Sequence, residues 1–464
     1  MRAPEPGSEI DGFRLGERIH TGTMAWIYRL MGSEGPLPLV MKIPRLGAGE
    51  PAINVISFEE CRMVLGALAQ GPHYPTLVAY GDVETTPYLV MEYIEGTRLG
   101  EWLQRAPIGA EEIAQLGAKL ALALHDIHRQ DVIHLDLKSA NVLYRPSGEA
   151  ALVDFGLAHH GHFPDLLAEE FRVPIGNWEY MSPEQILGIR CDPRSDVFAL
   201  GALLYQLATG ELPFGRPSSL GQLRRRLYRD PPPPRERNAA VPGWLQEVIL
   251  HCLETDNRNR YASAAQVAFD LANPGQVEVT ERGSRRGHPG WLRTLGRRIA
   301  ARQFVPAPCP PLAAPAEAAP IVLVAIATDQ GDEPLFDALR EAVRRLHAES
   351  ERWRVACVTV VPPAAALTGE GEGATATGRH IKHLVLLRRW ARALELPEER
   401  LTYHVLESEK PAAALIDYAT TNEVAHILLG EPRRGRARWG GSVAERVAAE
   451  APCSVTVARP RPGG

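Results

Sequence analysis

Residues 132–144 read VIHLDLKSANVLY and place an acid, a base and an amide close together in one short stretch. Asp136 and Asn141 are five positions apart, Lys138 stands between them, and Asp154 follows in VDFG at 153–156. Mg²⁺ is a hard cation that takes oxygen ligands from loops such as these. A lysine beside them would offset the charge of a transferring phosphoryl group. The stretch therefore predicts a site for magnesium and a polyphosphate.

Segments upstream of residue 132 supply further candidate groups for this phosphate site. VMK at 40–42 places Lys42 at the end of an apolar strand, where it can reach phosphate oxygens, and the loop IHTGTMAWIY at 19–28 comes before it. SFEECRMVLGAL at 57–68 has a helical pattern of apolar residues. This helix is predicted to carry the Glu60 carboxylate to Lys42.

In their order along the chain these motifs resemble the eukaryotic-like Ser/Thr protein kinases of bacteria. The resemblance runs from about residue 13 to 271. It rests on VMK, HLDLKSAN, DFG, SPE at 182–184, SDVFALG at 195–201 and the late arginine of DNRNRYASAAQV. It implies a multidomain chain that begins with an α+β bilobal protein-kinase fold, uses ATP and Mg²⁺ as cofactors and acts on a protein substrate.

The resemblance also implies roles for single residues. Asp136 would accept or orient the proton of the substrate hydroxyl with Lys138 beside it, and Lys42 would bind the ATP phosphates and pair with Glu60. Asn141 and Asp154 would hold the metal. The ATP pocket would be lined by Ile19, Gly22, Ile27, Val40, Met91, Glu92 and Ile94, with the backbone of Glu92 and Ile94 facing adenine. Glu184 would pair with Arg260 as a structural tie.

The phosphate loop departs from the family pattern GxGxxGxV. It has His20 and Ala25 in place of the outer glycines and keeps the middle one, Gly22. Glycine lets backbone amides approach phosphate without interference from a Cβ atom. The sequence therefore predicts a stiffer loop with lower ATP affinity, in an enzyme that keeps its activity.

Leu135 is a second departure, because the family carries an arginine at this place that pairs with phosphate on the activation segment. Residues 156–181 contain neither Ser nor Thr, so the receptor and the phosphate acceptor are missing together. An unpaired arginine beside Asp136 would cost free energy, which leucine avoids. The prediction is a kinase that is not switched by Ser/Thr phosphorylation of this segment.

Two other features of this segment allow more than one interpretation. Asn177 stands where the family usually has Thr, and its side-chain amide is expected to reach toward Asp136 and Lys138. His159, His160 and His162 could form a metal site or a pH sensor. A solvated loop is the favoured interpretation of the three histidines.

Composition changes after Leu271 and divides the chain. The predicted organisation is a tail at 1–12, a kinase domain at 13–272, a Pro/Ala/Arg-rich linker at 273–319 and a second domain at 320–460. Within the linker, WLRTLGRRIAARQF at 291–304 fits a basic amphipathic helix. A solvated linker helix is favoured over membrane binding.

Strand-like and helical runs alternate in the second domain, beginning with IVLVAIA at 321–327, which predicts a parallel α/β sheet. Together with TGEGEGATATG at 368–378 and GGSVAERVAAEAPCSVTVAR at 440–459, this resembles a universal stress protein domain. Gly430, Gly441 and Ser442 match the phosphate-holding positions of that family, whereas Arg433 and Ala327 depart from it. A regulatory or dimerising domain is favoured, which admits a homodimer, and nucleotide binding is left open.

Composition limits the partners and the cellular compartment that the protein is expected to have. The 464 residues carry a net charge of −5, which predicts no nucleic-acid partner. The six cysteines form no CxxC pair, which argues against a disulfide framework and a zinc site and for a reducing compartment. The start MRAPEPGSEIDG lacks the design of a signal peptide, and no apolar run reaches the length of a membrane span. The expected location is cytoplasmic, without membrane contact.

The favoured interpretation is thus a Ser/Thr protein kinase coupled to stress signalling through its C-terminal domain. The first alternative is a catalytically weak pseudokinase scaffold that acts by binding, and a second is a small-molecule phosphotransferase. The retained set of Lys42, Asp136, Asn141 and Asp154 speaks against the scaffold. The SPE motif and Arg260 favour a protein substrate.

Overall fold

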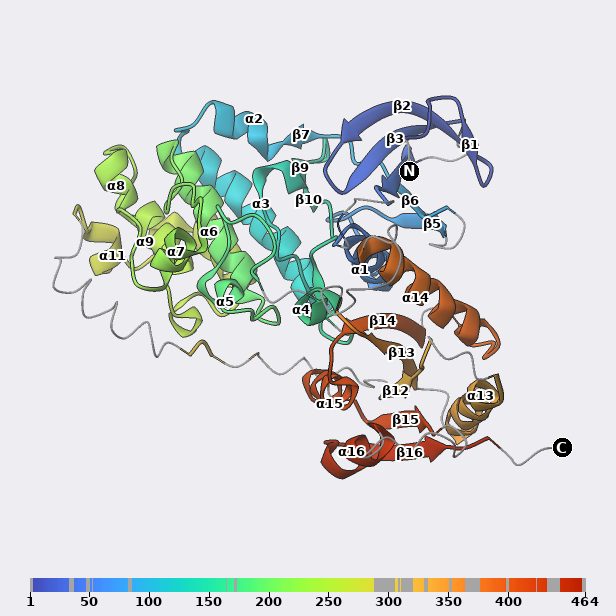
Figure 1. Cartoon of the computed structure of the whole chain (residues 1–464). Helices are drawn as coiled ribbons and strands as arrows, with labels where there is room; N and C mark the ends of the chain where they lie inside the picture. Colours follow the sequence, from blue (N-terminus) through green and yellow to red (C-terminus); the bar gives the residue numbers. More distant parts are fainter. Residues whose placement is uncertain are drawn as a thin grey trace.

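The computed structural model describes residues 3–32, 37–46, 51, 53–81, 86–163, 165–170, 173–287, 305–307, 309, 320–328, 333–349, 353–363, 376–397, 400–422, 424–431 and 443–460. In these residues the chain forms an N-terminal part with two lobes and a C-terminal part built on a separate parallel sheet (Figure 1). A strand-rich segment, a helical segment and a strand–helix alternation follow one another along the chain. The predicted class, a bilobal α+β fold followed by an α/β domain, is confirmed.

The first lobe is an antiparallel sheet with the strand order β1-β2-β3-β4-β6-β5 and one long helix, α1. Its elements are β1 (Glu9–Ile10), β2 (Phe13–Thr21), β3 (Ala25–Met31), β4 (Leu39–Pro44), α1 (Ile53–Ala67), β5 (Leu77–Gly81) and β6 (Tyr88–Glu92). Successive side chains of a strand point to opposite faces. Met41 therefore packs in the outer apolar cluster of the sheet, while Val40 joins the core that α1 covers.

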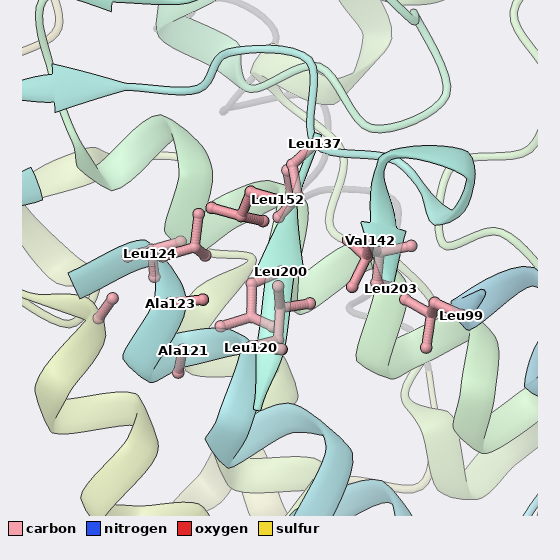
Figure 2. Packing of buried hydrophobic residues seen from close by; sticks show 14 of the residues in the cluster. Leu99, Leu120, Ala121, Ala123, Leu124, Leu137, Val142, Leu152, Leu200 and Leu203 are labelled. Carbon is pink, nitrogen blue, oxygen red and sulfur yellow. The ribbon is translucent and has the colours of Figure 1, made fainter. Parts of the chain in front are cut away.

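The second lobe is built around α3 and α6, whose leucines interlock (Figure 2). Apolar residues of α3 recur every three or four positions, which gives the helix one buried face. Gly117 of α3 allows close packing, because a Cβ atom there would lie 2.7 Å from Leu204 and 2.8 Å from Leu271. The helices are α2 (Leu99–Gln104), α3 (Ala110–His128), α5 (Pro183–Ile186), α6 (Arg194–Thr209), α7 (Leu220–Leu223), α8 (Pro234–Arg237), α9 (Gly243–Cys252), α10 (Ala264–Ala272) and α11 (Glu281–Ser284).

Short strand pairs bring the two motif loops together. β8 (Val132–Ile133) pairs with β11 (His159–His160), and β9 (Val142–Tyr144) pairs with β10 (Ala150–Leu152) and with β7 (Thr97–Arg98). HLDLKSAN at 134–141 connects β8 to β9, and DFG at 154–156 lies between β10 and β11. Because β8 pairs with β11 and β9 pairs with β10, the two loops that connect these strands lie next to each other. The helix α4 (Leu166–Glu170) follows β11 in the activation segment.

The C-terminal part is a five-stranded parallel sheet with the order β14-β13-β12-β15-β16. Its strands are β12 (Ile321–Ala325), β13 (Arg354–Val361), β14 (Leu401–Glu407), β15 (His426–Gly430) and β16 (Ser454–Ala458). α13 (Glu333–Glu349) and α14 (Ala376–Arg392) pack on one face, and α15 (Pro411–Thr421) and α16 (Val443–Glu450) pack on the other. The central strands β12, β13 and β15 thus bury side chains on both faces, which explains their apolar runs.

The second lobe continues past Asn273, where the linker was predicted to begin. The side chain of Gln246 on α9 donates to the backbone carbonyls of Arg282 at 2.7 Å and Arg285 at 2.8 Å. Glu247 accepts from the backbone N–H of Thr280 at 2.9 Å and of Gly283 at 2.7 Å. These bonds hold α11 on α9, so the packed domain includes residues up to about 286.

The linker returns to the second lobe at one described place. Cys309 forms a disulfide with Cys191, with their Cα atoms 5.5 Å apart, and the backbone N–H of Ala307 donates to the Asn257 side chain at 3.1 Å. The sequence argued against a disulfide framework, and this one bond is a correction, since spacing along the chain does not show which cysteines meet in the fold. The predicted helix at 291–304 lies outside the described residues. None of the described helices is long and apolar enough to cross a membrane.

Candidate active site

Asp136 lies at the centre of a set of polar contacts between β8 and β9. Its Oδ2 atom is 2.5 Å from Nζ of Lys138 and accepts a hydrogen bond from the Asn141 side-chain amide at 3.2 Å. The same amide donates to the Asp136 backbone carbonyl at 2.9 Å. Oδ1 of Asp136 accepts the backbone N–H of Asn177 at 3.1 Å. The structure thus brings together three of the predicted residues, Asp136, Lys138 and Asn141.

The backbone that carries Asp136 is fixed from α6. The Asp196 carboxylate accepts the backbone N–H groups of His134 at 2.8 Å and Leu135 at 2.9 Å, and it is 2.9 Å from Nε2 of His128. Leu135 has a left-handed backbone with φ of 59°, and its carbonyl accepts from the Gln185 side chain at 2.9 Å. The Leu135 side chain is 5% exposed, so this position is an apolar, packed one.

Lys42 on β4 pairs with Asp154, the aspartate of DFG. Nζ of Lys42 is 2.6 Å from Oδ1 of Asp154. Lys42 lowers the pKa of Asp154 to about 2, so the carboxylate is ionised at neutral pH. Burial acts to lower the pKa of Lys42, but the Asp154 carboxylate outweighs it and raises that pKa above its usual value. The two predicted residues therefore form a stable ion pair at the junction of the lobes.

The expected ion pair between Lys42 and Glu60 is not formed, which is a correction to the sequence analysis. Oε1 of Glu60 instead accepts the backbone N–H of Leu166 at 3.1 Å, below α1 in the activation segment. Burial, and then the neighbouring Asp165 carboxylate, raises the pKa of Glu60 well above its usual value. The physical reason is helix register, because adjacent residues of a helix point about 100° apart.

Cys61 is the α1 residue that faces the site. Its side chain is 1% exposed and lies near Lys42, Asp154 and the backbone of Phe155. In protein kinases a glutamate of this helix pairs with the lysine of the strand. Here a neutral side chain takes that place, since burial raises the pKa of the Cys61 thiol. Asp154 is consequently the carboxylate that orients Lys42.

The donor set suits Mg²⁺ held jointly with a polyphosphate. No three His, Cys, Asp or Glu side chains converge on one point in the described part of the chain. Mg²⁺ commonly takes only one or two protein carboxylates and completes its shell with phosphate oxygens and water. The Asp154 carboxylate and the Asn141 amide oxygen would provide such a set. Their loops are joined by the hydrogen bond from the Val153 N–H to the Asn141 carbonyl at 2.9 Å.

The predicted adenine pocket lies at the end of β6. Val40 and Met91 are buried in the main core, Ile27 packs against it, and Ile19 is more exposed. The backbone N–H of Glu92 donates to the carbonyl of Thr76, just before β5, at 2.9 Å. The Glu92 side chain is 2.5 Å from Nη1 of Arg145, which fixes the segment on the second lobe.

The loop predicted to bind the phosphates has a tight turn at Gly22. Its N–H donates to the Ala25 carbonyl at 3.0 Å, and a Cβ atom at Gly22 would lie 3.1 Å from Nε2 of His20. The exposed His20 ring thus lies against Gly22, at a position where the family has glycine. The turn supports the prediction that this loop is stiffer.

The activation segment differs from two expectations. The side-chain oxygen of Asn177 accepts the Glu179 N–H at 3.0 Å, so the backbone N–H of Asn177, and not its amide, reaches Asp136. His159 and His160 are not solvated: His160 is buried and its ring stacks on Phe163 with centroids 4.2 Å apart. Burial lowers the pKa of His160 to about 3, so its ring is neutral near pH 7.

The predicted structural tie between Glu184 and Arg260 is confirmed. Nη1 and Nη2 of Arg260 lie 2.6 and 2.8 Å from the two carboxylate oxygens of Glu184, and both side chains are fully buried. Asp196 and Cys61, by contrast, were not assigned roles from the sequence. Asp196 belongs to the SDVFALG motif, so a role for it could have been predicted from the sequence. The position of Cys61 beside Lys42 could have been predicted only from the register of α1.

Comparisons with known proteins agree with this arrangement. Residues 14–270 match the protein kinase domain, and residues 322–459 match the universal stress protein family. The Serine/threonine-protein kinase Pkn1 of Myxococcus xanthus is 32% identical over 317 residues, which are 63% of this chain and 42% of the relative. PknB of Mycolicibacterium smegmatis is 30% identical over 269 residues, 56% of this chain and 42% of the relative.

The chain spans less than half the length of these curated relatives. Among solved structures, the kinase domain of PknI from Mycobacterium tuberculosis is 20% identical and has a TM-score of 0.45. That similarity covers 58% of this chain and 99% of the PknI chain.

Proposed function

Because the chain belongs to the protein kinase domain family and a universal stress protein domain follows in the same chain, we propose that it is a Ser/Thr protein kinase. It transfers the γ-phosphate of ATP to hydroxyl groups of protein substrates. The observation that carries this proposal is the set of contacts around Asp136, which joins the base, Lys138 and Asn141 within hydrogen-bond distance.

Asp136 has the geometry of the residue that receives the substrate proton. One of its oxygens is held by Lys138 and Asn141 and the other by the Asn177 backbone, so the carboxylate has a fixed direction. A substrate hydroxyl hydrogen-bonded to Asp136 would be aligned with the γ-phosphate. Lys138, close to the same oxygen, would neutralise charge that develops on the transferring group.

Lys42 and Asp154 would position the nucleotide. Lys42 lies at the lobe junction, where it would bind phosphate oxygens, and its ion pair with Asp154 would orient it. A magnesium ion on Asp154 and Asn141 would supply charge neutralisation between the phosphates. The adenine would lie between Ile27, Val40 and Met91, with Ile19 and Gly22 at the mouth and the backbone of Glu92 and Ile94 at the edge.

The proposal includes independence from Ser/Thr phosphorylation of the activation segment. Leu135 is packed and apolar, and the described residues of 156–181 reach Asp136 through the backbone of Asn177. Tyr180 is the only hydroxyl in 156–181; it is buried and donates to Gln206 at 2.8 Å. Treatment with a phosphatase should therefore leave the rate of substrate phosphorylation unchanged, and a loss of rate would contradict this part.

Coupling to stress signalling through the C-terminal domain is also proposed. Nucleotide binding by that domain stays a prediction, since Arg433, Gly441 and Ser442 lie outside the described residues. Homodimerisation through it likewise stays a prediction. We also propose the predicted segment limits, with the kinase domain extended to about residue 286, and a cytoplasmic location.

The test is transfer of radiolabelled γ-phosphate from Mg-ATP to a generic protein acceptor by the full chain. Replacement of Asp136 by Asn should lower the rate by about 10²-fold or more, the lower limit for a general base. The matched control Asp417→Asn changes an exposed aspartate on α15 and should leave the rate within twofold. Absence of transfer by the wild-type chain despite ATP binding would favour the scaffold interpretation. Transfer to small molecules alone would favour the small-molecule phosphotransferase.

A further inference from the structure

The C-terminal domain touches the kinase domain at two regulatory segments, α1 and the activation segment. In Figure 1, α14 lies beside α1, and the end of the sheet that carries β14 lies near α4. Leu46 and Val55 of the first lobe belong to the same apolar cluster as Trp390 and Tyr403 of the C-terminal domain. The two domains therefore share a continuous buried core at this place.

A buried charge network joins α14 to α1. Nη2 of Arg388 is 2.8 Å from Oε1 of Glu59, and Nε of Arg62 is 3.1 Å from Oε2 of the same carboxylate. Both side chains of the Arg388–Glu59 pair are less than 10% exposed. Burial acts to raise the pKa of Glu59, but Arg388 and Arg62 outweigh it and hold that pKa below its usual value. A buried carboxylate of this kind depends on its partner, because loss of the partner leaves a desolvated charge.

A second arginine of the C-terminal domain holds the activation segment. Nη1 of Arg354, at the start of β13, donates to the carbonyl of His162 at 2.7 Å. The guanidinium also lies 4.7 Å above the ring of Phe163, a cation–π contact. His162 is fastened to the second lobe as well, since its Nε2 is 2.9 Å from Asp131. The segment that follows DFG is thus held between the kinase domain and Arg354.

These contacts involve the two elements for which the kinase domain lacks the usual stabilising interactions of its own. α1 has no carboxylate on Lys42, because Cys61 takes that place and Glu60 points to Leu166. The activation segment has no Ser or Thr in 156–181, and Leu135 replaces the arginine that would bind a phosphate. In protein kinases the position of this helix and the order of the activation segment control whether the catalytic groups are in place. Here two arginines from another domain contact the same two elements.

We propose that the C-terminal domain is a built-in activating partner of the kinase domain, with Arg388 on Glu59 and Arg354 on His162 and Phe163 as its two holding points. Docking keeps α1 against the sheet and the activation segment against Asp136. Undocking leaves α1 and the described residues of 159–170 loosely held and lowers the population of the active arrangement. A signal that alters the C-terminal domain would act through this population. The inference rests on the proposed kinase activity.

The experiment uses the full chain with Arg388→Ala, Arg354→Ala and the matched control Arg389→Ala, which removes an exposed arginine next to Arg388 on α14. We expect kcat/KM to fall about tenfold in the first two, within the range of measured coupling energies, and to stay within twofold in the control. Hydrogen exchange of amides in α1 and in 159–170 should speed up in the Arg388 and Arg354 variants alone. Exchange in α3 and α6 should be unchanged, which excludes general unfolding.

A double-variant cycle tests whether Arg388 acts through Glu59. Glu59→Gln with Arg388→Ala should be no slower than the slower of the two single variants, because both changes break one contact. Unchanged kcat/KM and unchanged exchange in both arginine variants would overturn the inference, as would a rise in kcat/KM. If the wild-type chain transfers no phosphate, the proposed function fails, and hydrogen exchange alone still reports whether docking holds α1.

Discussion

The Nζ atom of Lys42 lies 2.6 Å from Oδ1 of Asp154, and this is the one carboxylate that pairs with Lys42 in the described part of the chain. Asp154 therefore orients the lysine, and under the proposed function it would also offer oxygen to a metal. Cys61 makes this necessary, because it fills the place beside Lys42 where a carboxylate of α1 would otherwise lie. One carboxylate, that of Asp154, lies beside Lys42, whereas protein kinases usually have the DFG aspartate and a helix glutamate there.

Loss of Lys42 should therefore be severe, and loss of the Glu60 carboxyl group mild. We expect Lys42→Met to lower kcat/KM by about 10²-fold, of the order found when one charge-stabilising group is removed. Glu60→Gln should stay within threefold, because the amide oxygen can still accept the Leu166 N–H. Lys119→Met, on the exposed face of α3, is the control for the lysine change. Equal losses in the Lys42 and Glu60 variants would show that the two residues pair in the working enzyme.

The neighbours Glu59 and Glu60 should affect stability with opposite dependence on pH. The pKa of Glu60 is raised in the fold, so the native protein retains a proton that the unfolded chain releases, and stability falls as pH rises above about 4.5. Glu60→Gln should therefore raise the melting temperature relative to wild type more at pH 8 than at pH 5. The pKa of Glu59 is lowered, so its contribution is present above about 4.5 and is lost as pH falls.

Glu59→Gln is accordingly the matched comparison. It should lower the melting temperature at both pH 5 and pH 8, with a smaller effect at pH 4. Thermal unfolding of the full-length variants, followed by circular dichroism at the three pH values, measures both dependences. A Glu60 variant whose advantage does not grow between pH 5 and pH 8 would mean that Glu60 is ionised in the native state.

The buried pair of Arg260 with Glu184 should contribute strongly to stability. Arg260→Ala leaves the Glu184 carboxylate desolvated and should lower the free energy of unfolding by about 3–5 kcal/mol. Arg258→Ala removes an arginine two residues away whose side chain is 60% exposed in its pair with Asp256. Exposed pairs contribute about 0–1 kcal/mol. Urea unfolding should separate the two variants clearly, and similar midpoints would contradict the buried arrangement.

The cysteines should divide into one bonded pair and four thiols. After denaturation without reductant, titration should find four free thiols, Cys61, Cys252, Cys357 and Cys453, and peptide mapping should join Cys191 to Cys309. In the native protein Cys453 should be alkylated before the other three, because it is the least buried of the four. Six free thiols in the unreduced protein would show that the linker is not tied to the second lobe.

Much of the site could be predicted because its residues are close in sequence. Asp136, Lys138 and Asn141 share one loop, and a loop of that length between two short strands leaves few ways to arrange them. The Glu184–Arg260 tie was also predictable, although the two are far apart in the chain, because both belong to motifs of one family. Glu60 was assigned wrongly, because a helical pattern shows which residues are buried but not which buried residue meets a given lysine.

The sequence by itself determined the two folds, their order and the meeting of Lys138 and Asn141 with Asp136, because periodic apolar patterns and local motifs specify elements and their loops. Only the tertiary structure decided that Cys61 lies beside Lys42, that Cys309 meets Cys191, and that Arg388 and Arg354 reach α1 and the activation segment. The physical reason is distance along the chain: Arg388 and Glu59 are separated by 329 positions. No local propensity couples them, and their contact depends on how two finished domains pack.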